Sequence, residues 1–464
     1  MIQQNTNVLI LADHDYTRCL GAYRLASDIR SSGYTCQVID KISKFNNEEL
    51  VWLYSTAIGK DTLVLGISTT FFNMFEYDHN PNIAWGLISR LIFFARKVNP
   101  TIKIVIGGGM TFQPTPALTE KVDLTITGMG EHALLQYLSR LTGRLLPIRY
   151  ASTEFDIFNS ETIFHPSDNI RSDEPLPIEL ARGCIFKCKF CSYPLLGKKK
   201  NDYMKSKNAM KNEFIRNYNE FGVTRYSIVD STHNDNNVKL QDLADVVQSL
   251  PFKLEYCCFI RIDLLRSKPE QYQMLIDSGM TGCFFGIETL NSRSAKCIGK
   301  GLDSEKVVEE LYTFKERMPD VGTCGAFICG LPYETKETID AWSKTIIGAD
   351  FPLDEAIMQA LSIDRSGAGF QSEFERNSDK YYTWENPWTW NNGDFNRDWA
   401  EEFSDEFKKR SSVRARIGGW NSVVHLKPWN TTVIKKPLIS MDPWLRKHWA
   451  ECEKTYKKAL GLVG

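Results

Sequence analysis

Short apolar runs alternate with stretches of helical periodicity along most of this chain, and this alternation restricts the fold more than any other feature. Runs of this kind between helices are typical of strands buried on both faces, and they predict a doubly wound parallel sheet. In the first 145 residues the predicted strands are 7–12, 35–40, 62–68, 102–109 and 124–128, and the predicted helices are 21–30, 83–98 and 131–141.

A second series of apolar runs begins after residue 176, and its predicted strands are 177–182, 225–230, 255–262, 282–288, 322–330 and 355–363. Six βα units predict a partial (β/α)6 TIM-like barrel with its active site at the carboxyl ends of the strands. We therefore expect an α/β fold with four regions: a doubly wound domain (1–145), a linker (146–175), the partial barrel (176–365) and a small C-terminal cap (366–464). The Trp- and Tyr-rich segment 381–399 either covers the active site or packs on the barrel, and packing is the simpler expectation.

Charge and cysteine content exclude several classes of protein. The net charge of −1 gives no indication of binding to nucleic acid or to an anionic membrane. No run approaches about 18 apolar residues, and the N-terminal sequence lacks a signal-peptide pattern. Twelve cysteines in 464 residues are too few for a disulfide framework. We expect a cytoplasmic protein without a membrane partner.

Three cysteines form a CxxxCxxC pattern in ELARGCIFKCKFCSY (179–193), at Cys184, Cys188 and Cys191. Three thiolates in one polar loop can hold three irons of a 4Fe–4S cluster and leave the fourth iron open. An open iron can bind the amino and carboxylate groups of S-adenosylmethionine, whose reductive cleavage releases a 5′-deoxyadenosyl radical. The alternative is zinc, but zinc closes its shell with four ligands, and no second CxxC or His pair follows.

The triplet and its position after the first barrel strand resemble the radical S-adenosylmethionine superfamily, in particular its cobalamin-binding, class B methylase-like members. The segments RIDLL (261–265), GCFFGIETLN (282–291) and GAFICGLPYET (325–335) resemble later strands of that barrel. The resemblance extends from about residue 7 to about residue 365.

This resemblance implies a set of contacts to S-adenosylmethionine. Phe190 would lie near the adenine, Asp230 near the amino group, Arg261 at the methionine carboxylate and Glu288 near the methionyl or ribose groups. Gly325 and Gly330 would let the adenine approach closely. Alternative roles stay open for three of these residues. Arg261 and Glu288 could pair with each other, and Asp230 could cap a helix. The usual Gly-Gly-Glu of the second strand is replaced by DSTHNDN (230–236).

The first domain resembles cobalamin-binding Rossmann-like domains. The matching segments are LGAYRLASDIRSSGYTCQVID (20–40), GISTT (66–70), VIGGGMTFQP (105–114) and TGMGEHALLQYL (127–138). The cobalamin contacts implied in this way are Asp13, His14, Gly21, Ser68, Thr69, Gly107, Gly108, Gly128, Gly130 and Glu131. Related domains bind cobalt through the His of DxHxxG, but ADHDYTRCLG (12–21) has a different spacing, so no bond from His14 to cobalt is expected.

The resemblance implies a cobalamin-dependent enzyme that methylates an unactivated carbon of a small-molecule or peptide substrate. Its electron donor would be a protein such as flavodoxin or ferredoxin. The alternative is a radical isomerase, epimerase or cyclase that transfers no methyl group. A methylthiotransferase would need three further N-terminal cysteines, and only Cys19 and Cys36 precede the barrel.

Overall fold

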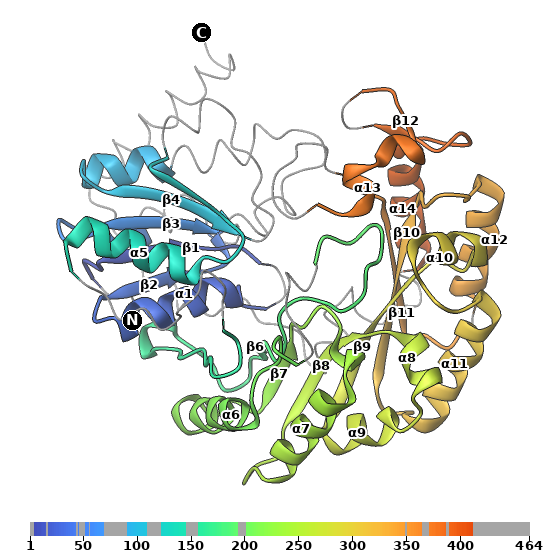
Figure 1. Cartoon of the computed structure of the whole chain (residues 1–464), viewed down its shortest axis with the longest axis horizontal. Helices are drawn as coiled ribbons and strands as arrows, with labels where there is room; N and C mark the ends of the chain where they lie inside the picture. Colours follow the sequence, from blue (N-terminus) through green and yellow to red (C-terminus); the bar gives the residue numbers. More distant parts are fainter. Residues whose placement is uncertain are drawn as a thin grey trace. The chain divides into compact units, whose positions relative to one another are not determined.

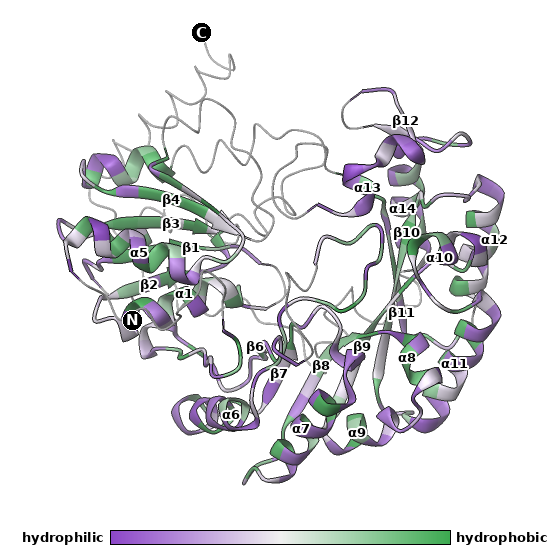
Figure 2. Ribbon diagram, viewed as in Figure 1, coloured by the Kyte–Doolittle hydropathy of each residue, from purple (hydrophilic) through white to green (hydrophobic). Residues whose placement is uncertain are grey.

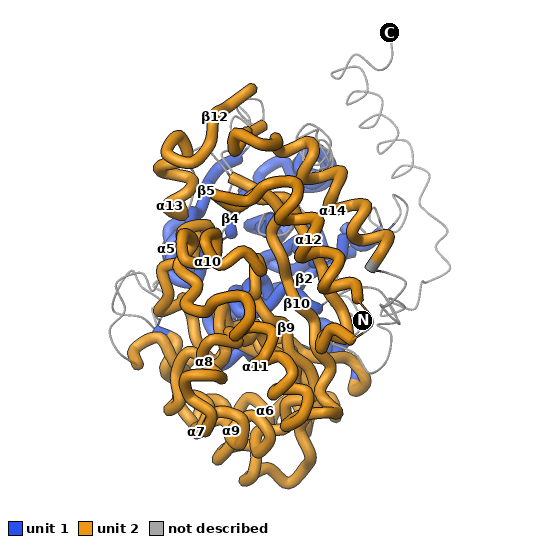
Figure 3. Tube along the Cα trace, turned by 90° about the vertical axis from the view of Figure 1, so that its right-hand side faces the viewer, with its two compact units in different colours: residues 1–156, 161–171, 430–464 blue, residues 157–160, 172–429 orange. Residues whose placement is uncertain are grey.

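The computed structural model describes residues 4–14, 17–42, 45, 52–54, 56–68, 91–108, 122–144, 156–193, 201–348, 350–363, 371–386 and 389–411. These residues form two compact units (Figure 3). Unit 1 contains the described residues up to 156 together with 161–171, and unit 2 contains 157–160 and 172–411. Each unit is described by itself.

Unit 1 is built on a five-stranded parallel sheet (Figure 1). Its strands lie in the order β2 (Cys36–Ile39), β1 (Val8–Leu11), β3 (Val64–Ser68), β4 (Lys103–Gly108) and β5 (Leu124–Thr127). Alternate residues of β1, β3 and β4 share a buried core with the helical residues 91–98. The helices α1 (Leu20–Ser31) and α5 (Glu131–Thr142) contact each other, and α1 packs against β2. The predicted Rossmann-like sheet is confirmed, and its order places the topological switch point between β1 and β3.

Unit 2 contains a six-stranded parallel sheet whose strands follow one another in sequence order. They are β6 (Leu176–Ile178), β7 (Arg225–Ile228), β8 (Glu255–Ile260), β9 (Met280–Glu288), β10 (Gly322–Cys329) and β11 (Glu355–Ala360). Every predicted barrel strand is present, and β6 and β11 are the two edges of the sheet among the described residues. The sheet is therefore the predicted partial barrel.

Helices connect the strands of unit 2 and cover the outer side of its sheet (Figure 1). They are α6 (Lys207–Phe221), α7 (Asn237–Gln248), α8 (Ile262–Ser267), α9 (Gln271–Asp277), α10 (Ser292–Ile298), α11 (Ser304–Arg317) and α12 (Lys336–Ile347). Their surfaces mix hydrophilic and hydrophobic residues, whereas the strands are mostly hydrophobic (Figure 2). This pattern explains why the strands read as apolar runs in the sequence.

The segment after the barrel packs on its last strands. It contains α13 (Glu373–Arg376), the short hairpin β12 (Thr383–Trp384) and β13 (Trp390–Asn391), and α14 (Arg397–Ser411). The helix α14 contacts β10, β11 and α12. The Trp390 ring is fully buried, and its Nε1 donates a hydrogen bond to the Leu361 carbonyl at 2.8 Å. The Trp- and Tyr-rich segment therefore packs on the barrel.

The region expected to link the domains is partly held by unit 1. Residues 161–171 belong to that unit, and the Asp168 carboxylate accepts two hydrogen bonds from the Arg30 guanidinium, at 2.7 and 2.8 Å. Among the described residues, no helix is long and apolar enough to cross a membrane.

Candidate active site

The cysteine loop begins where β6 ends, at the carboxyl edge of the unit 2 sheet. Backbone hydrogen bonds tie its first residues to the segment before α6: Lys205 N–H donates to the Leu180 carbonyl at 2.7 Å, and Arg182 N–H donates to the Tyr203 carbonyl at 2.9 Å. The Arg182 side chain also pairs with Glu179 at 2.7 Å. The chain therefore enters the cysteine triplet along a fixed path.

The three thiols of the triplet are free and lie close to one another. Cys184 is buried, whereas Cys188 and Cys191 are half-buried, and Cys191 N–H donates to the Cys188 carbonyl at 3.0 Å. Burial raises the pKa of the Cys191 thiol to about 11, and the charges of Cys184 and Cys188 add to this rise. All three thiols belong to the single segment from Cys184 to Cys191, directly after β6.

The donor set fits a cluster better than a single ion. Within the described ranges, no group of three His, Cys, Asp or Glu side chains could hold one metal ion. A cuboidal cluster has a different requirement, because each of its thiolate ligands binds a separate iron. Three neighbouring free thiols on one loop, Cys184, Cys188 and Cys191, meet that requirement.

Two later parts of the chain support the cysteine loop from outside. Lys189 N–H donates to the Ile298 carbonyl at the end of α10, at 3.1 Å. The Lys189 carbonyl accepts from Phe374 N–H of α13 at 2.9 Å, and its ammonium donates to the Tyr381 hydroxyl at 3.0 Å. The C-terminal segment, which packs on the barrel, therefore also contacts the cysteine loop.

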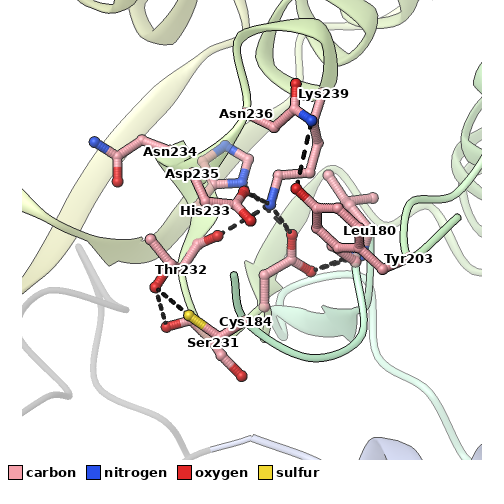
Figure 4. Close-up of polar contacts among 12 residues, drawn as sticks. Leu180, Cys184, Tyr203, Ser231, Thr232, His233, Asn234, Asp235, Asn236 and Lys239 are labelled. Atoms are coloured by element: carbon pink, nitrogen blue, oxygen red, sulfur yellow. Dashed lines mark hydrogen bonds and ion pairs between the residues drawn. The ribbon is translucent and has the colours of Figure 1, made fainter. Parts of the chain in front are cut away.

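The end of β7 carries a buried network of charges (Figure 4). The Asp230 carboxylate accepts from Leu180 N–H at 2.7 Å and from Ala181 N–H at 2.9 Å, and it pairs with Lys239 at 3.0 Å. Lys239 is completely buried and also pairs with Asp235 at 2.7 Å. Burial opposes ionisation of Asp230, but the Lys239 charge prevails and lowers the pKa of that carboxyl to about 2.

The contact of Asp230 to the amino group of S-adenosylmethionine stays a prediction. Its carboxylate is buried, and its two oxygens bind the peptide that leads into the cysteine loop and the Lys239 ammonium. These contacts anchor the start of the cysteine loop. In the same network, the Thr232 carbonyl accepts from Lys239 at 3.0 Å, and the Thr232 hydroxyl lies 3.5 Å from Cys184 Sγ (Figure 4).

Charged side chains alternate at the ends of β8 and β9. Arg261 follows β8 and pairs with Asp263 at 2.6 Å, whereas Glu288 ends β9 and pairs with Lys300 at 3.1 Å. Arg261 and Glu288 thus have separate partners and do not pair with each other. Glu288 has a φ of 72°, a strained backbone for a residue with a side chain.

Lys300 was not predicted as a site residue. It lies in the Gly-Lys-Gly segment after α10, where Gly299 approaches the cysteine loop: a Cβ on that glycine would lie 3.8 Å from Cys188 Cα. The flanking glycines of this segment are the signal in the sequence that could have indicated Lys300.

Gly325 in β10 and Gly330 directly after it both pack closely against other side chains. A Cβ on Gly330 would lie 2.1 Å from the Trp390 ring, and a Cβ on Gly325 would lie 2.5 Å from Leu353. The protein's own side chains thus make close approaches at both glycines, and the adenine contact expected there stays a prediction. Phe190 is half-buried within the cysteine loop.

The residues predicted in unit 1 gather at one edge of its sheet. Asp13 and His14 follow β1, and Ser68 ends β3, on either side of the switch point where ligands of such sheets bind. The same edge carries the ends of β4 and β5, and the predicted residues there are Gly107, Gly108, Gly128, Gly130 and Glu131. Gly21 lies in the first turn of α1, and Thr69 lies outside the described residues.

Several of these residues have partners within unit 1. A Cβ on Gly107 would lie 3.0 Å from the Ile126 carbonyl oxygen, and one on Gly130 would lie 3.3 Å from the Leu25 side chain. These two glycines therefore permit close packing inside the unit. The His14 Nδ1 accepts a hydrogen bond from Thr17 N–H at 3.3 Å.

Comparisons with known proteins agree with this architecture. Residues 178–346 match the Radical SAM superfamily. An uncharacterized methyltransferase of Pyrococcus horikoshii is 24% identical over 351 residues, which are 70% of this chain and 72% of that protein.

Two solved structures have a similar fold. One is the radical S-adenosylmethionine methyltransferase TsrM from Kitasatospora setae with cobalamin and a [4Fe-4S] cluster bound, with a TM-score of 0.59, 14% identity, and coverage of 77% of this chain and 76% of that one. The other is the cobalamin-dependent S-adenosylmethionine radical enzyme OxsB in its apo form, with a TM-score of 0.56 and 16% identity. The match to OxsB covers 81% of this chain and 56% of that chain.

Proposed function

We propose that this chain, whose residues 178–346 match the Radical SAM superfamily, is a cobalamin-dependent radical S-adenosylmethionine enzyme that methylates an unactivated carbon. The observation that carries the proposal is the group of three neighbouring free thiols, Cys184, Cys188 and Cys191, at the carboxyl edge of a partial barrel. A second sheet, with the strand order 2-1-3-4-5, precedes that barrel in the sequence. Sheets of this order bind ligands at their switch point, and this favours cobalamin as a second cofactor.

The residues of unit 2 would bind and orient the first cofactor pair. Cys184, Cys188 and Cys191 would hold the 4Fe–4S cluster, and the adjacent Glu288–Lys300 pair offers one anion and one cation to the amino and carboxylate groups of S-adenosylmethionine. Phe190 keeps its proposed position near the adenine. When bound, the cluster supplies the electron that cleaves S-adenosylmethionine, and cobalamin supplies a carrier for the methyl group.

Unit 1 would bind cobalamin at the carboxyl edge of its sheet. The support is the placement of Asp13, His14, Ser68 and the glycine-bearing ends of β4 and β5 at one edge, together with the bound cobalamin in the TsrM structure. His14 would not bind cobalt through Nδ1, because that nitrogen accepts a hydrogen bond from Thr17 N–H.

The regions 1–145, 146–175, 176–365 and 366–464 are proposed as the cobalamin domain, the linker, the radical domain and the cap. The substrate would be a small molecule or a peptide, and a flavodoxin or ferredoxin would supply electrons. The eleven cysteines described by the structure are free thiols, which suits a reducing compartment such as the cytoplasm.

The test is anaerobic purification with cobalamin supplied, followed by an optical spectrum and assays of iron, sulfide and cobalt. We expect about four irons and about one cobalt per chain. Cys188→Ser should lose most of the iron, because a cluster ligand is removed. Cys297→Ser is the matched control, since Cys297 is another half-buried cysteine next to Ile298, whose carbonyl supports the loop.

Product analysis then separates methyl transfer from other radical reactions. Methyl transfer predicts both 5′-deoxyadenosine and S-adenosylhomocysteine. Iron without cobalt, and turnover without S-adenosylhomocysteine, would overturn the methylase and favour an isomerase, epimerase or cyclase. Wild-type iron content in Cys188→Ser would overturn the assignment of the cluster ligands.

A further inference from the structure

The Arg261 guanidinium lies directly against the cysteine loop. Its Nη1 is 3.2 Å from Cys188 Sγ and donates a hydrogen bond to that sulfur. The guanidinium carbon lies 4.0 Å from the ring centroid of Phe186, which belongs to the same loop. Arg261 therefore contacts the loop through both a sulfur atom and an aromatic face.

Neighbouring groups fix Arg261 in this orientation. Its Nε and Nη2 donate to the two oxygens of Asp263, at 3.0 and 2.6 Å. Its backbone N–H donates to Asn234 Oδ1 at 2.9 Å, and its carbonyl accepts from Asn234 Nδ2 at 3.0 Å. The residue is only 6% exposed, so the guanidinium has little freedom to turn.

The contact to Asp263 also restricts what else Arg261 can bind. A guanidinium binds a carboxylate bidentately through two parallel N–H groups, and the Nε–Nη2 edge is already occupied by Asp263. Of the other N–H groups of the guanidinium, one on Nη1 donates to Cys188 Sγ, so the Nη1–Nη2 edge is also partly used. The geometry therefore disfavours the role in binding the methionine carboxylate that the sequence resemblance implied.

We propose that Arg261 is a positioning residue that donates a hydrogen bond to the cluster ligand Cys188 and raises the reduction potential of the cluster. This inference rests on the proposed function, because it requires a cluster on the cysteine triplet. A reduced cluster carries one more negative charge than an oxidised one, so a cationic donor at a ligand sulfur stabilises the reduced state more. The Asp263 carboxylate holds the donor in place.

The test uses Arg261→Gln, Arg261→Lys and the double variant Arg261→Gln/Asp263→Asn. Each is purified with its cluster, and two quantities are measured: the midpoint potential by a redox titration followed by EPR, and the dissociation constant of S-adenosylmethionine. The double variant removes one positive and one negative charge, so it keeps the net charge of the wild type near the cluster. A shift that persists in it reports the lost hydrogen bond.

We expect a more negative potential in Arg261→Gln and in the double variant, with a smaller shift in Arg261→Lys, which keeps the charge. The dissociation constant should stay within about twofold of the wild-type value, because no contact to the substrate is lost. If Arg261→Gln does not retain its iron, the midpoint potential of Arg261→Lys is compared with that of the wild type instead.

Two results would overturn the inference. One is an unchanged potential with a dissociation constant raised more than about tenfold, as the loss of a charged hydrogen bond to the methionine carboxylate would produce. The other is a shift that disappears in the double variant, which would assign it to charge alone. Failure of the wild-type protein to bind a cluster would instead refute the proposed function, and the two failures are therefore distinct.

Discussion

Replacement of Lys239 by Met removes the only ammonium that contacts both Asp230 and Asp235 among the described residues. Lys239 is fully buried, and its nitrogen lies 3.0 Å from Asp230, 2.7 Å from Asp235 and 3.0 Å from the Thr232 carbonyl (Figure 4). Methionine has a similar length and fills the same volume. The substitution therefore deletes the charge with little change in packing.

The expected loss is large because both carboxylates stay buried without a cation. Breaking a buried ion pair by removing one partner costs about 3–5 kcal/mol in the free energy of unfolding. For a unit of this size, each kcal/mol lowers the melting temperature by about 2–4 °C, so Lys239→Met should melt on the order of 10 °C below the wild type.

The assay is thermal unfolding of the apoprotein followed by tryptophan fluorescence, since Trp390 is buried in unit 2. Lys207→Met is the matched control. Lys207 also pairs with two carboxylates, Asp245 at 2.5 Å and Asp242 at 3.7 Å, but its side chain is exposed. Because solvent screens an exposed pair, the control should leave the melting temperature unchanged.

The pH dependence supplies a second check. In the wild type, the pKa of Asp230 is lowered to about 2. The ionised carboxylate therefore contributes fully to the free energy of unfolding above its ordinary pKa near 3.9, and this contribution is lost only as the pH falls toward 2. In Lys239→Met, burial without a cation raises the pKa of the same carboxyl, so the variant regains stability as the pH falls. The gap between the two proteins should narrow from about pH 8 to pH 5. Equal melting of Lys239→Met and Lys207→Met, or a gap independent of pH, would refute this reasoning.

Three further predictions concern the contacts between β10 and the C-terminal segment. Gly330→Ala should destabilise unit 2 by about 2 kcal/mol or more in denaturant unfolding, because the added Cβ would meet the Trp390 ring at 2.1 Å. Gly393→Ala is the control, since Gly393 has a similar positive φ but nothing within 4 Å of an added Cβ, and it should cost less. Equal losses in the two variants would contradict the steric explanation. Tyr382→Phe should cost about 1 kcal/mol in the same assay by removing the hydrogen bond to the Gly330 carbonyl, and an unchanged midpoint would exclude that contribution. Burial raises the pKa of Glu334 to about 7, so its contribution to the free energy of unfolding is complete below its ordinary pKa and falls as the pH rises toward 7. Glu334→Gln should therefore flatten the pH dependence of stability between about pH 5 and 7. An unchanged slope would refute this titration.

The sequence predicted the strands of both sheets well because buried parallel strands must be apolar on both faces. Val8–Leu11 and Met280–Glu288, for example, lie within two residues of the predicted boundaries 7–12 and 282–288. The same property could not reveal the roles of individual polar residues, since these depend on partners from other elements.

Asp230 and Gly330 illustrate this limit. The function of Asp230 depends on Lys239, which lies nine residues later on α7, and on the peptide before the cysteine loop. The space beside Gly330 is filled by Trp390, which comes from a segment without periodicity. In both cases the folded chain supplies close partners to a residue for which the family pattern had implied a ligand contact. Only the cysteine spacing could be interpreted from the local sequence alone, because it does not depend on partners from other elements.

The support of Lys189 by the C-terminal segment also has a consequence for the order of biosynthesis. The hydrogen bond between Lys189 and Tyr381 joins residues 192 positions apart. At the translation rates of about 5–20 residues per second, the ribosome makes the cysteine loop many seconds before it makes Phe374 and Tyr381. A nascent chain that ends before α13 has all three cysteines but lacks these supporting contacts. The contacts that support the cysteine loop are therefore complete only after the last third of the barrel and the segment that follows it have been made.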